Sequence, residues 1–149
     1  MMFSEEAVKI FDSGYNCAQA VLLAFSEKFN IDKDSAVKIA SGFGGGMARM
    51  QETCGAVTGG IMIAGLAFTN IMEDNATNKE RVYYIISQFI MRFKEKYGTI
   101  KCSELLNCDR NTEEGQRYYE KNNLQQNICR NCVEDVTRLL DDLTKKYNQ

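Results

Sequence analysis

The sequence predicts an all-α protein: a single-domain bundle of about five helices over residues 1–149, with a glycine-rich central helix. Three observations support this fold class. Apolar residues recur every three or four positions along most of the chain. No segment alternates apolar and polar residues for long enough to form a strand, and 44% of the 149 residues are hydrophobic, which is sufficient for one buried core.

The first half of the chain contains two predicted helix starts and one predicted bend. Ser4 is placed to cap a first helix from Glu5 to Phe29. The stretch from Asp32 to Ser35 offers a cap for a second helix that includes residues 36–40. The glycine cluster at 42–46 must then break or bend the chain, because glycine disfavours helix and permits unusual backbone conformations.

The uncharged segment from Cys54 to Met72 is the predicted central helix. Its length of about 19 residues approaches that of a membrane-spanning helix. However, four glycines, at 55, 59, 60 and 65, interrupt it, and no aromatic belt flanks it. We therefore predict a buried core helix whose glycines let another backbone pack closely, and no association with a membrane.

The second half of the chain is predicted to form one long helix, two short helices and a final helix. A polar loop over 73–78 precedes the long helix, which ends at Gly98. The short helices are expected near 103–107 and 115–121. The apolar faces are Val82, Ile86, Phe89, Phe93 and Tyr97 in the long helix, and Val133, Val136, Leu140 and Leu143 in the final helix.

Composition excludes several classes of function. The net charge is −2 and no basic stripe is present, so we do not expect nucleic-acid binding. The chain has no histidine, which excludes Ser-His-Asp triads, histidine metal ligands and histidine-ligated haem. It has no proline, which excludes the cis-proline loop of thioredoxin-like folds. Residues 1–6 lack the pattern of a signal peptide, so a cytoplasmic location is expected.

Six cysteines are the main candidates for chemistry. In an intracellular protein this number favours metal, cluster or redox use, although buried cysteine also serves as a small apolar residue. Cys54 begins the central helix, where the helix N-terminus lowers a thiol pKa, and it follows the glycine cluster, whose N–H groups could approach a sulfur. The Cys129–Cys132 CxxC pair is a redox dithiol, half of a cluster site, or chance. The cysteines are at positions 17, 54, 102, 108, 129 and 132.

A specific resemblance rests on the cysteines and the glycine-rich stretch. The matching segments are 13–21 (SGYNCAQAV), 42–50 (GFGGGMARM), 53–59 (TCGAVTG), 102–106 (CSELL) and Cys129. With these segments the chain resembles the redox-active protein family named for its cysteine pattern, C-GCAxxG-C-C. The resemblance implies that Cys17, Cys54, Cys102 and Cys129 are the family cysteines and that Cys108 and Cys132 are additional. It implies redox activity, which the family is assigned mainly because of its cysteines. A related domain occurs in a split-Soret type cytochrome that also holds an iron–sulfur cluster, but the haem part does not carry over, since this chain has no histidine.

Three functions are compatible with these residues. The first is an electron-transfer protein that binds an iron–sulfur cluster, without haem, through Cys17, Cys54, Cys102 and Cys129, and exchanges electrons with a redox partner protein. Gly44, Gly45, Gly46 and Gly55 would let backbone groups approach that cofactor. The second is a thiol–disulfide oxidoreductase with Cys54 as the attacking thiolate. The third is a helical interaction module with buried thiols, and the glycine-lined helix also suggests a homodimer.

The charged residues beside Cys54 have two interpretations. Arg49 and Glu52 flank the start of the predicted central helix. A solvated ion pair between them is the simpler interpretation. The alternative is that Arg49 holds a thiolate or a bound anion near Cys54.

Overall fold

The computed structural model describes residues 2–147 as an all-α fold, which confirms the predicted class. Within these residues there are eight α-helices rather than about five, and no strand; one isolated antiparallel bridge joins Thr53 to Lys101. The helices are α1 (Phe3–Asp12), α2 (Cys17–Phe25), α3 (Lys33–Ala40), α4 (Gly55–Phe68), α5 (Asn75–Tyr97), α6 (Cys102–Leu106), α7 (Glu113–Lys121) and α8 (Arg130–Tyr147), with a 3-10 turn at Ser41–Phe43 and a π-helical turn at Gln125–Cys129.

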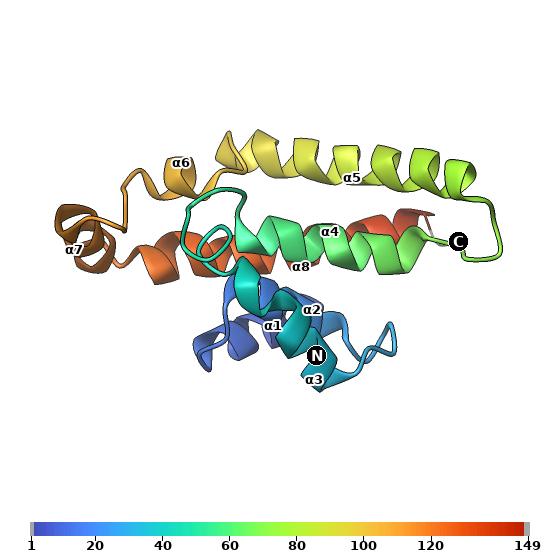
Figure 1. The fold of residues 1–149 in the computed structure, drawn as a ribbon, viewed down its shortest axis with the longest axis horizontal. Helices are drawn as coiled ribbons and strands as arrows, with labels where there is room; N and C mark the ends of the chain where they lie inside the picture. Colours follow the sequence, from blue (N-terminus) through green and yellow to red (C-terminus); the bar gives the residue numbers. More distant parts are fainter. Residues whose placement is uncertain (1, 148–149) are drawn as a thin grey trace.

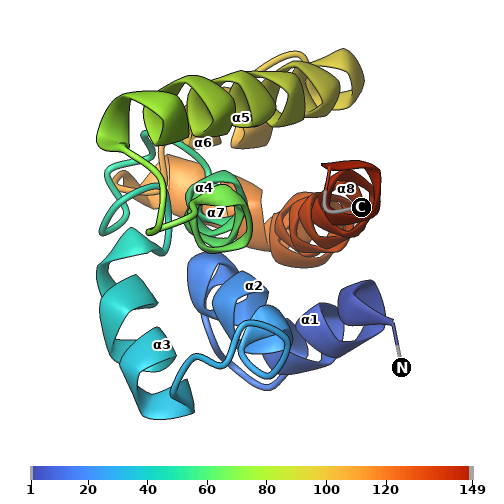
Figure 2. The same cartoon turned by 90° about the vertical axis from the view of Figure 1, so that its right-hand side faces the viewer.

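The helices form three layers around α4 (Figures 1 and 2). The long helix α5 covers one side of α4 and α8, while α1, α2 and α3 cover the opposite side. Helix α4 contacts α2, α5 and α8, so it occupies the centre as predicted. Helices α6 and α7 lie at one end of the molecule, next to the segment that leads into α4.

The glycines of α4 allow neighbouring helices to approach its backbone. A Cβ added to Gly59 would lie 3.1 Å from the Cα of Ala18 in α2. A Cβ added to Gly60 would lie 2.6 Å from the ring of Phe89 in α5. The predicted close packing of another backbone is thus confirmed at Gly59, whereas at Gly60 a side chain takes the space. This packing takes place inside this chain, so it no longer supports the homodimer, which stays a prediction. Gly65 has open space beside it.

Helix α4 is shorter than the predicted central helix from Cys54 to Met72. The helix spans 14 residues, from Gly55 to Phe68. Within residues 2–147, no helix combines the length and apolar character needed to cross a bilayer. The residues after it form a turn instead of extending the helix to Met72.

The predicted first helix from Glu5 to Phe29 is wrong, because the chain forms two helices there. Gly14 adopts a φ of 111° and interrupts the first helix. A capping box then starts α2: the Asn16 side chain accepts a bond from the backbone N–H of Gln19 at 2.8 Å, and the Gln19 side chain accepts from the N–H of Asn16 at 3.0 Å. This local pattern overrides the continuous apolar periodicity.

The two predicted helix caps have different outcomes. Asp32 is confirmed as the cap of α3, since its Oδ2 accepts a bond from the N–H of Ser35 at 2.9 Å. Ser4 does not cap α1. It is buried inside that helix, and Met2 occupies the N-cap position without a side-chain hydrogen bond.

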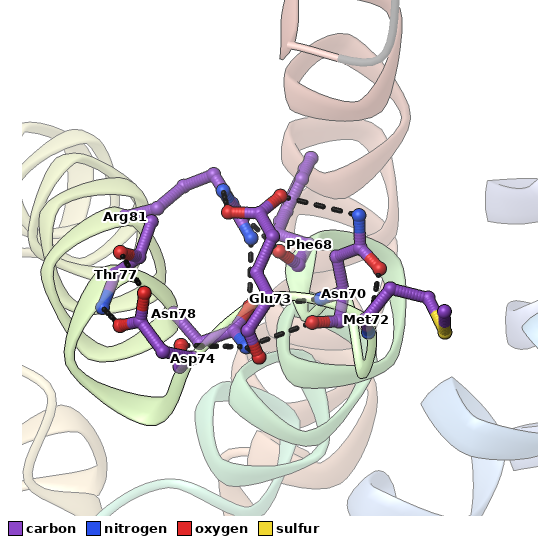
Figure 3. Close-up of polar contacts among 8 residues, drawn as sticks. All are labelled: Phe68, Asn70, Met72, Glu73, Asp74, Thr77, Asn78 and Arg81. Atoms are coloured by element: carbon purple, nitrogen blue, oxygen red, sulfur yellow. Dashed lines mark hydrogen bonds and ion pairs between the residues drawn. The ribbon is translucent and has the colours of Figure 1, made fainter.

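The turn between α4 and α5 is fixed by one arginine (Figure 3). Arg81 Nε donates to the carbonyl of Phe68 at 2.9 Å, and Nη1 pairs with Glu73 at 2.9 Å. Nη2 donates to Asn78 Oδ1 at 2.7 Å, and Asn78 in turn donates to the carbonyl of Asn70 at 2.8 Å. This polar network orients α5 along α4 and lies at the C-terminal end of α4, whereas Cys54 is at its N-terminal end.

Candidate cysteine redox site

Five of the six cysteines line one cavity of about 470 Å³. Four of them are the cysteines predicted to share a site, so the structure brings that set together. The fifth is Cys132, which the sequence analysis set aside as additional. Cys108 does not line the cavity. The cysteines of the cavity are Cys17, Cys54, Cys102, Cys129 and Cys132.

Most of these cysteines lie where a helix begins. Cys17 is the first residue of α2, Cys102 is the first residue of α6, and Cys54 is the N-cap of α4. A helix N-terminus presents unpaired N–H groups and the positive end of the helix dipole, which favours an anionic sulfur. Cys129 ends the π-helical turn and Cys132 lies in the first turn of α8. Their separation of three residues places both on one helix face.

Cys54 and Cys132 form an inner thiol pair. The two thiols are only 6% and 1% exposed, and each shifts the pKa of the other. The Cys132 thiol lowers the pKa of Cys54, and the nearby N–H groups of Val57 and Ala56 lower it further. The same pairing raises the pKa of Cys132.

Cys17 and Cys129 form an outer thiol pair, in which both residues are half-buried. The pKa of Cys129 is lowered to about 7, first by a hydrogen bond from the Cys17 thiol. The hydroxyl of Tyr119, 3.9 Å from Cys129 Sγ, and the positive charge of Arg110 lower it further. The pKa of Cys17 is raised well above its ordinary value by the same hydrogen bond and by burial.

The outer pair predicts a pH-dependent labelling pattern. With a pKa of about 7, half of the Cys129 thiols are ionised at neutral pH. The rate of Cys129 alkylation by iodoacetamide should therefore reach half of its maximum near pH 7 and level off only well above that pH, because only the thiolate reacts. Cys108, whose pKa is raised by burial, should still be accelerating at pH 8.5 to 9. Peptide mass spectrometry after short labelling pulses gives both profiles, and identical profiles would contradict this assignment.

Cys102 differs from the paired cysteines. Burial and the neighbouring cysteines raise its pKa to about 12. All six cysteines are free thiols in this structure. Within residues 2–147, no three or more Cys, Asp or Glu side chains are grouped closely enough to hold a single metal ion.

One wall of the cavity is a left-handed turn in the glycine-rich segment. Every residue from Gly45 to Arg49 has a positive φ, with values between 53° and 68°. Backbone bonds close the turn, such as Arg49 N–H to the carbonyl of Gly44 at 3.1 Å and Gln51 N–H to the carbonyl of Gly45 at 3.0 Å. Left-handed conformation costs about 1–2 kcal/mol for each residue with a side chain. Strain of this kind is concentrated at functional sites.

The predicted cofactor-binding glycines divide between two positions. Gly44, Gly45 and Gly55 line the cavity, as expected for close backbone approach. Gly46 does not. It lies behind Cys102, where an added Cβ would be 2.7 Å from the Cys102 Cβ. Its role in the structure is to let the turn pack against that cysteine.

Three site residues were missed by the sequence analysis. Gln51 is buried and joins the left-handed turn to the segment after α6: its Nε2 donates to the carbonyl of Cys108 at 2.8 Å, and its Oε1 accepts from the N–H of Arg110 at 2.7 Å. The Arg110 guanidinium stacks over the Tyr119 ring, 3.7 Å from its centroid. No sequence pattern indicated these contacts, which link positions far apart in the chain.

Comparison with known proteins places the chain in a family. The sequence profile described as "Putative redox-active protein (C_GCAxxG_C_C)" matches residues 15–143, which include all six cysteines. An uncharacterized protein of Archaeoglobus fulgidus is 29% identical over 106 residues, covering 66% of this chain and 70% of the relative. No solved structure matches the chain. Because the matched residues cover most of the chain, this protein belongs to the C_GCAxxG_C_C family of redox-active proteins.

Proposed function

We propose that this protein is a thiol–disulfide redox protein with two dithiol pairs, Cys17–Cys129 and Cys54–Cys132. The observation that supports it is that each thiol of lowered pKa owes this shift first to the thiol of a second cysteine that lines the same cavity. A low-pKa thiolate is the attacking group in disulfide exchange, and an adjacent thiol resolves the mixed disulfide. The sequence predicts Cys54 as the attacking thiolate in the thiol–disulfide function. We now assign external attack to Cys129, because it is less buried than Cys54.

The reaction at the outer pair balances as a two-electron exchange. The Cys129 thiolate attacks one sulfur of an external disulfide, whose S–S bond breaks and releases one thiolate that takes up a proton. Cys17 then loses its proton and attacks the Cys129 sulfur of the mixed disulfide, which expels the second thiol. Two protein thiols are oxidised to one disulfide, and the external disulfide is reduced to two thiols.

Thiol counting tests this proposal. The reduced chain has six thiols, and full oxidation by a small disulfide should leave two, those of Cys102 and Cys108, because each pair closes one bridge. Proteolysis without reduction should yield peptides that link Cys17 to Cys129 and Cys54 to Cys132. A mixture of unrelated linkages, or no intramolecular bridge, would contradict the proposal.

A second candidate, the iron–sulfur protein, is favoured by the position of the four family cysteines. Cys17, Cys54, Cys102 and Cys129 line one cavity, and their sulfurs are the soft donors that iron–sulfur clusters require. The helix starts and the left-handed turn would supply N–H groups near those sulfurs. Four thiolates are the number and type of ligands that such a cluster uses, and a bound cluster would give the protein one-electron redox chemistry.

A matched pair of serine variants separates the two candidates. Cys102 belongs to the proposed cluster ligands but to neither thiol pair, whereas Cys132 belongs to a pair but not to the ligands. If the protein holds a cluster, Cys102→Ser should remove iron and acid-labile sulfide from anaerobically purified protein, and Cys132→Ser should retain them. If it works by dithiol exchange, Cys102→Ser should form both bridges and Cys132→Ser only one. Both residues are buried, at 8% and 1% exposure, so their packing costs are comparable.

A further inference from the structure

The cysteine cavity carries positive charge that no carboxylate balances. Arg49 and Arg110 both line it, and no Asp or Glu does. Of the seven ion pairs formed within residues 2–147, none includes either arginine, so the predicted pair between Arg49 and Glu52 does not form. Both arginines therefore border a cavity whose lining residues include thiols but no carboxylate.

Arg110 is held in place by contacts that leave part of its guanidinium free. Its Nε donates to Gln116 Oε1 at 3.1 Å, its planar group stacks on Tyr119, and its backbone N–H donates to the buried Gln51 at 2.7 Å. None of the hydrogen bonds formed within residues 2–147 uses its Nη groups, which are the usual donors to a carboxylate. Tyr119 also contacts Cys129, so Arg110 is anchored next to the outer thiol pair.

Arg49 belongs to the left-handed turn that forms one wall of the cavity. It ends the run of left-handed residues, with a φ of 62°, and its carbonyl accepts a bond from Asn111 Nδ2 at 3.0 Å. Its backbone N–H is bonded to Gly44 at 3.1 Å. The backbone of Arg49 is thus fixed on both sides while its side chain borders the cavity. A strained turn that is pinned in this way positions the arginine rather than leaving it on a variable loop.

We propose that the cavity binds small disulfides that carry carboxylate groups, with Arg49 and Arg110 holding the carboxylates while Cys129 attacks the S–S bond. This inference rests on the proposed dithiol function and adds its substrate class. A carboxylate matches two unpaired guanidinium groups in charge and in hydrogen-bond geometry. The cavity of about 470 Å³ is of the size of small-molecule sites. The exchange is the reaction written above for the outer pair, and the carboxylates take no part in the electron balance.

The experiment compares three symmetric small disulfides that differ in charge. Reduced protein is mixed at low salt with dithiodiglycolate (anionic), 2-hydroxyethyl disulfide (neutral) or cystamine (cationic), and thiol loss is followed. The three disulfides differ in the reactivity of their own S–S bonds. This difference is removed when the rate of each variant is divided by the wild-type rate with the same disulfide. Arg49→Gln and Arg110→Gln should each slow the anionic reagent by roughly three- to tenfold relative to the neutral one, and speed the cationic reagent relative to the neutral one. Arg110→Gln should also slow all three reagents together, because the charge of Arg110 lowers the pKa of Cys129.

A matched control and a charge-preserving variant make the result specific. Arg117→Gln, on the exposed face of α7 and outside the cavity, changes the net charge equally and should have little effect. Arg110→Lys should recover most of the preference for the anionic reagent even where Arg110→Gln perturbs packing on Tyr119. Equal effects of all three Gln variants, or a charge preference that persists in the double Arg49→Gln/Arg110→Gln variant, would overturn the inference.

A second readout keeps this inference separate from the proposed function. The ratio of Cys129 alkylation rates with iodoacetate and with iodoacetamide reports the charge recognition without any disulfide exchange. If this ratio falls in the Gln variants but none of the disulfides oxidises a pair, anion recognition stands and the dithiol function fails. If the disulfides oxidise both pairs at rates independent of Arg49 and Arg110, the function stands and the substrate class is wrong.

Discussion

Replacing Cys129 with serine is expected to slow the reaction of the reduced protein with a small disulfide by roughly tenfold or more at pH 7. The variant loses the one half-buried thiol whose pKa is lowered to about 7. Its neighbour Cys17 has a raised pKa and so contributes little thiolate at neutral pH. The reaction rate should fall by a smaller factor than the thiolate fraction does, because a thiolate of higher pKa is intrinsically more nucleophilic. Stopped-flow measurement of thiol loss gives the rate directly.

Two further serine variants define what this result means. Cys108→Ser is the control, because Cys108 is also half-buried but lies outside the cavity, and its rate should equal that of the unmodified protein. Cys54→Ser should leave the fast phase intact and remove one of the two bridges formed at completion. A fast phase that is lost in Cys54→Ser and kept in Cys129→Ser would return the attacking role to Cys54, as the sequence first indicated.

The fold class was predictable because it depends on local periodicity. The apolar faces of α5 and α8 and the caps at Asp32 and Gly98 are encoded within a few residues, and all are present. The division of the first helix was missed because Gly14 and the Asn16–Gln19 capping box interrupt an apolar pattern that otherwise continues. A single capping motif outweighed that periodicity.

The candidate site was predictable in part for a different reason. The four family cysteines share a cavity, and their grouping came from a recognised pattern rather than from spacing. Cys132 was set aside, although as the second half of CxxC it shares a helix face with Cys129. The Arg110–Tyr119 contact depends on how the segment from α6 to α7 folds back over α8, which local sequence does not encode. The left-handed conformation of Met47, Ala48 and Arg49 opposes their intrinsic preference, so no propensity could indicate it.

Gly46→Ala is expected to lower the free energy of unfolding by about 2–5 kcal/mol, which would leave a protein of this size barely stable. Gly46 has a φ of 68°, which alone disfavours a side chain. In addition, an added Cβ would lie 2.7 Å from the Cβ of Cys102 and 2.8 Å from the backbone nitrogen of Glu52. Neither neighbour moves easily, because the carbonyl of Glu52 accepts the backbone N–H of Cys102 at 2.6 Å.

Gly98→Ala is the control that separates the free-energy cost of the positive φ from the cost of the contacts made by the added Cβ. Gly98 caps α5 with a similar φ of 77° but has no heavy atom within 4 Å of an added Cβ. Its substitution should therefore carry the conformational cost alone, about 1–2 kcal/mol. Urea unfolding of both variants measures the difference, and equal losses would mean that contact with Cys102 does not constrain the turn. If the contact does constrain it, any Gly46→Ala protein that folds must displace the turn. The charge preference set by Arg49 would then weaken even though no cysteine has been changed.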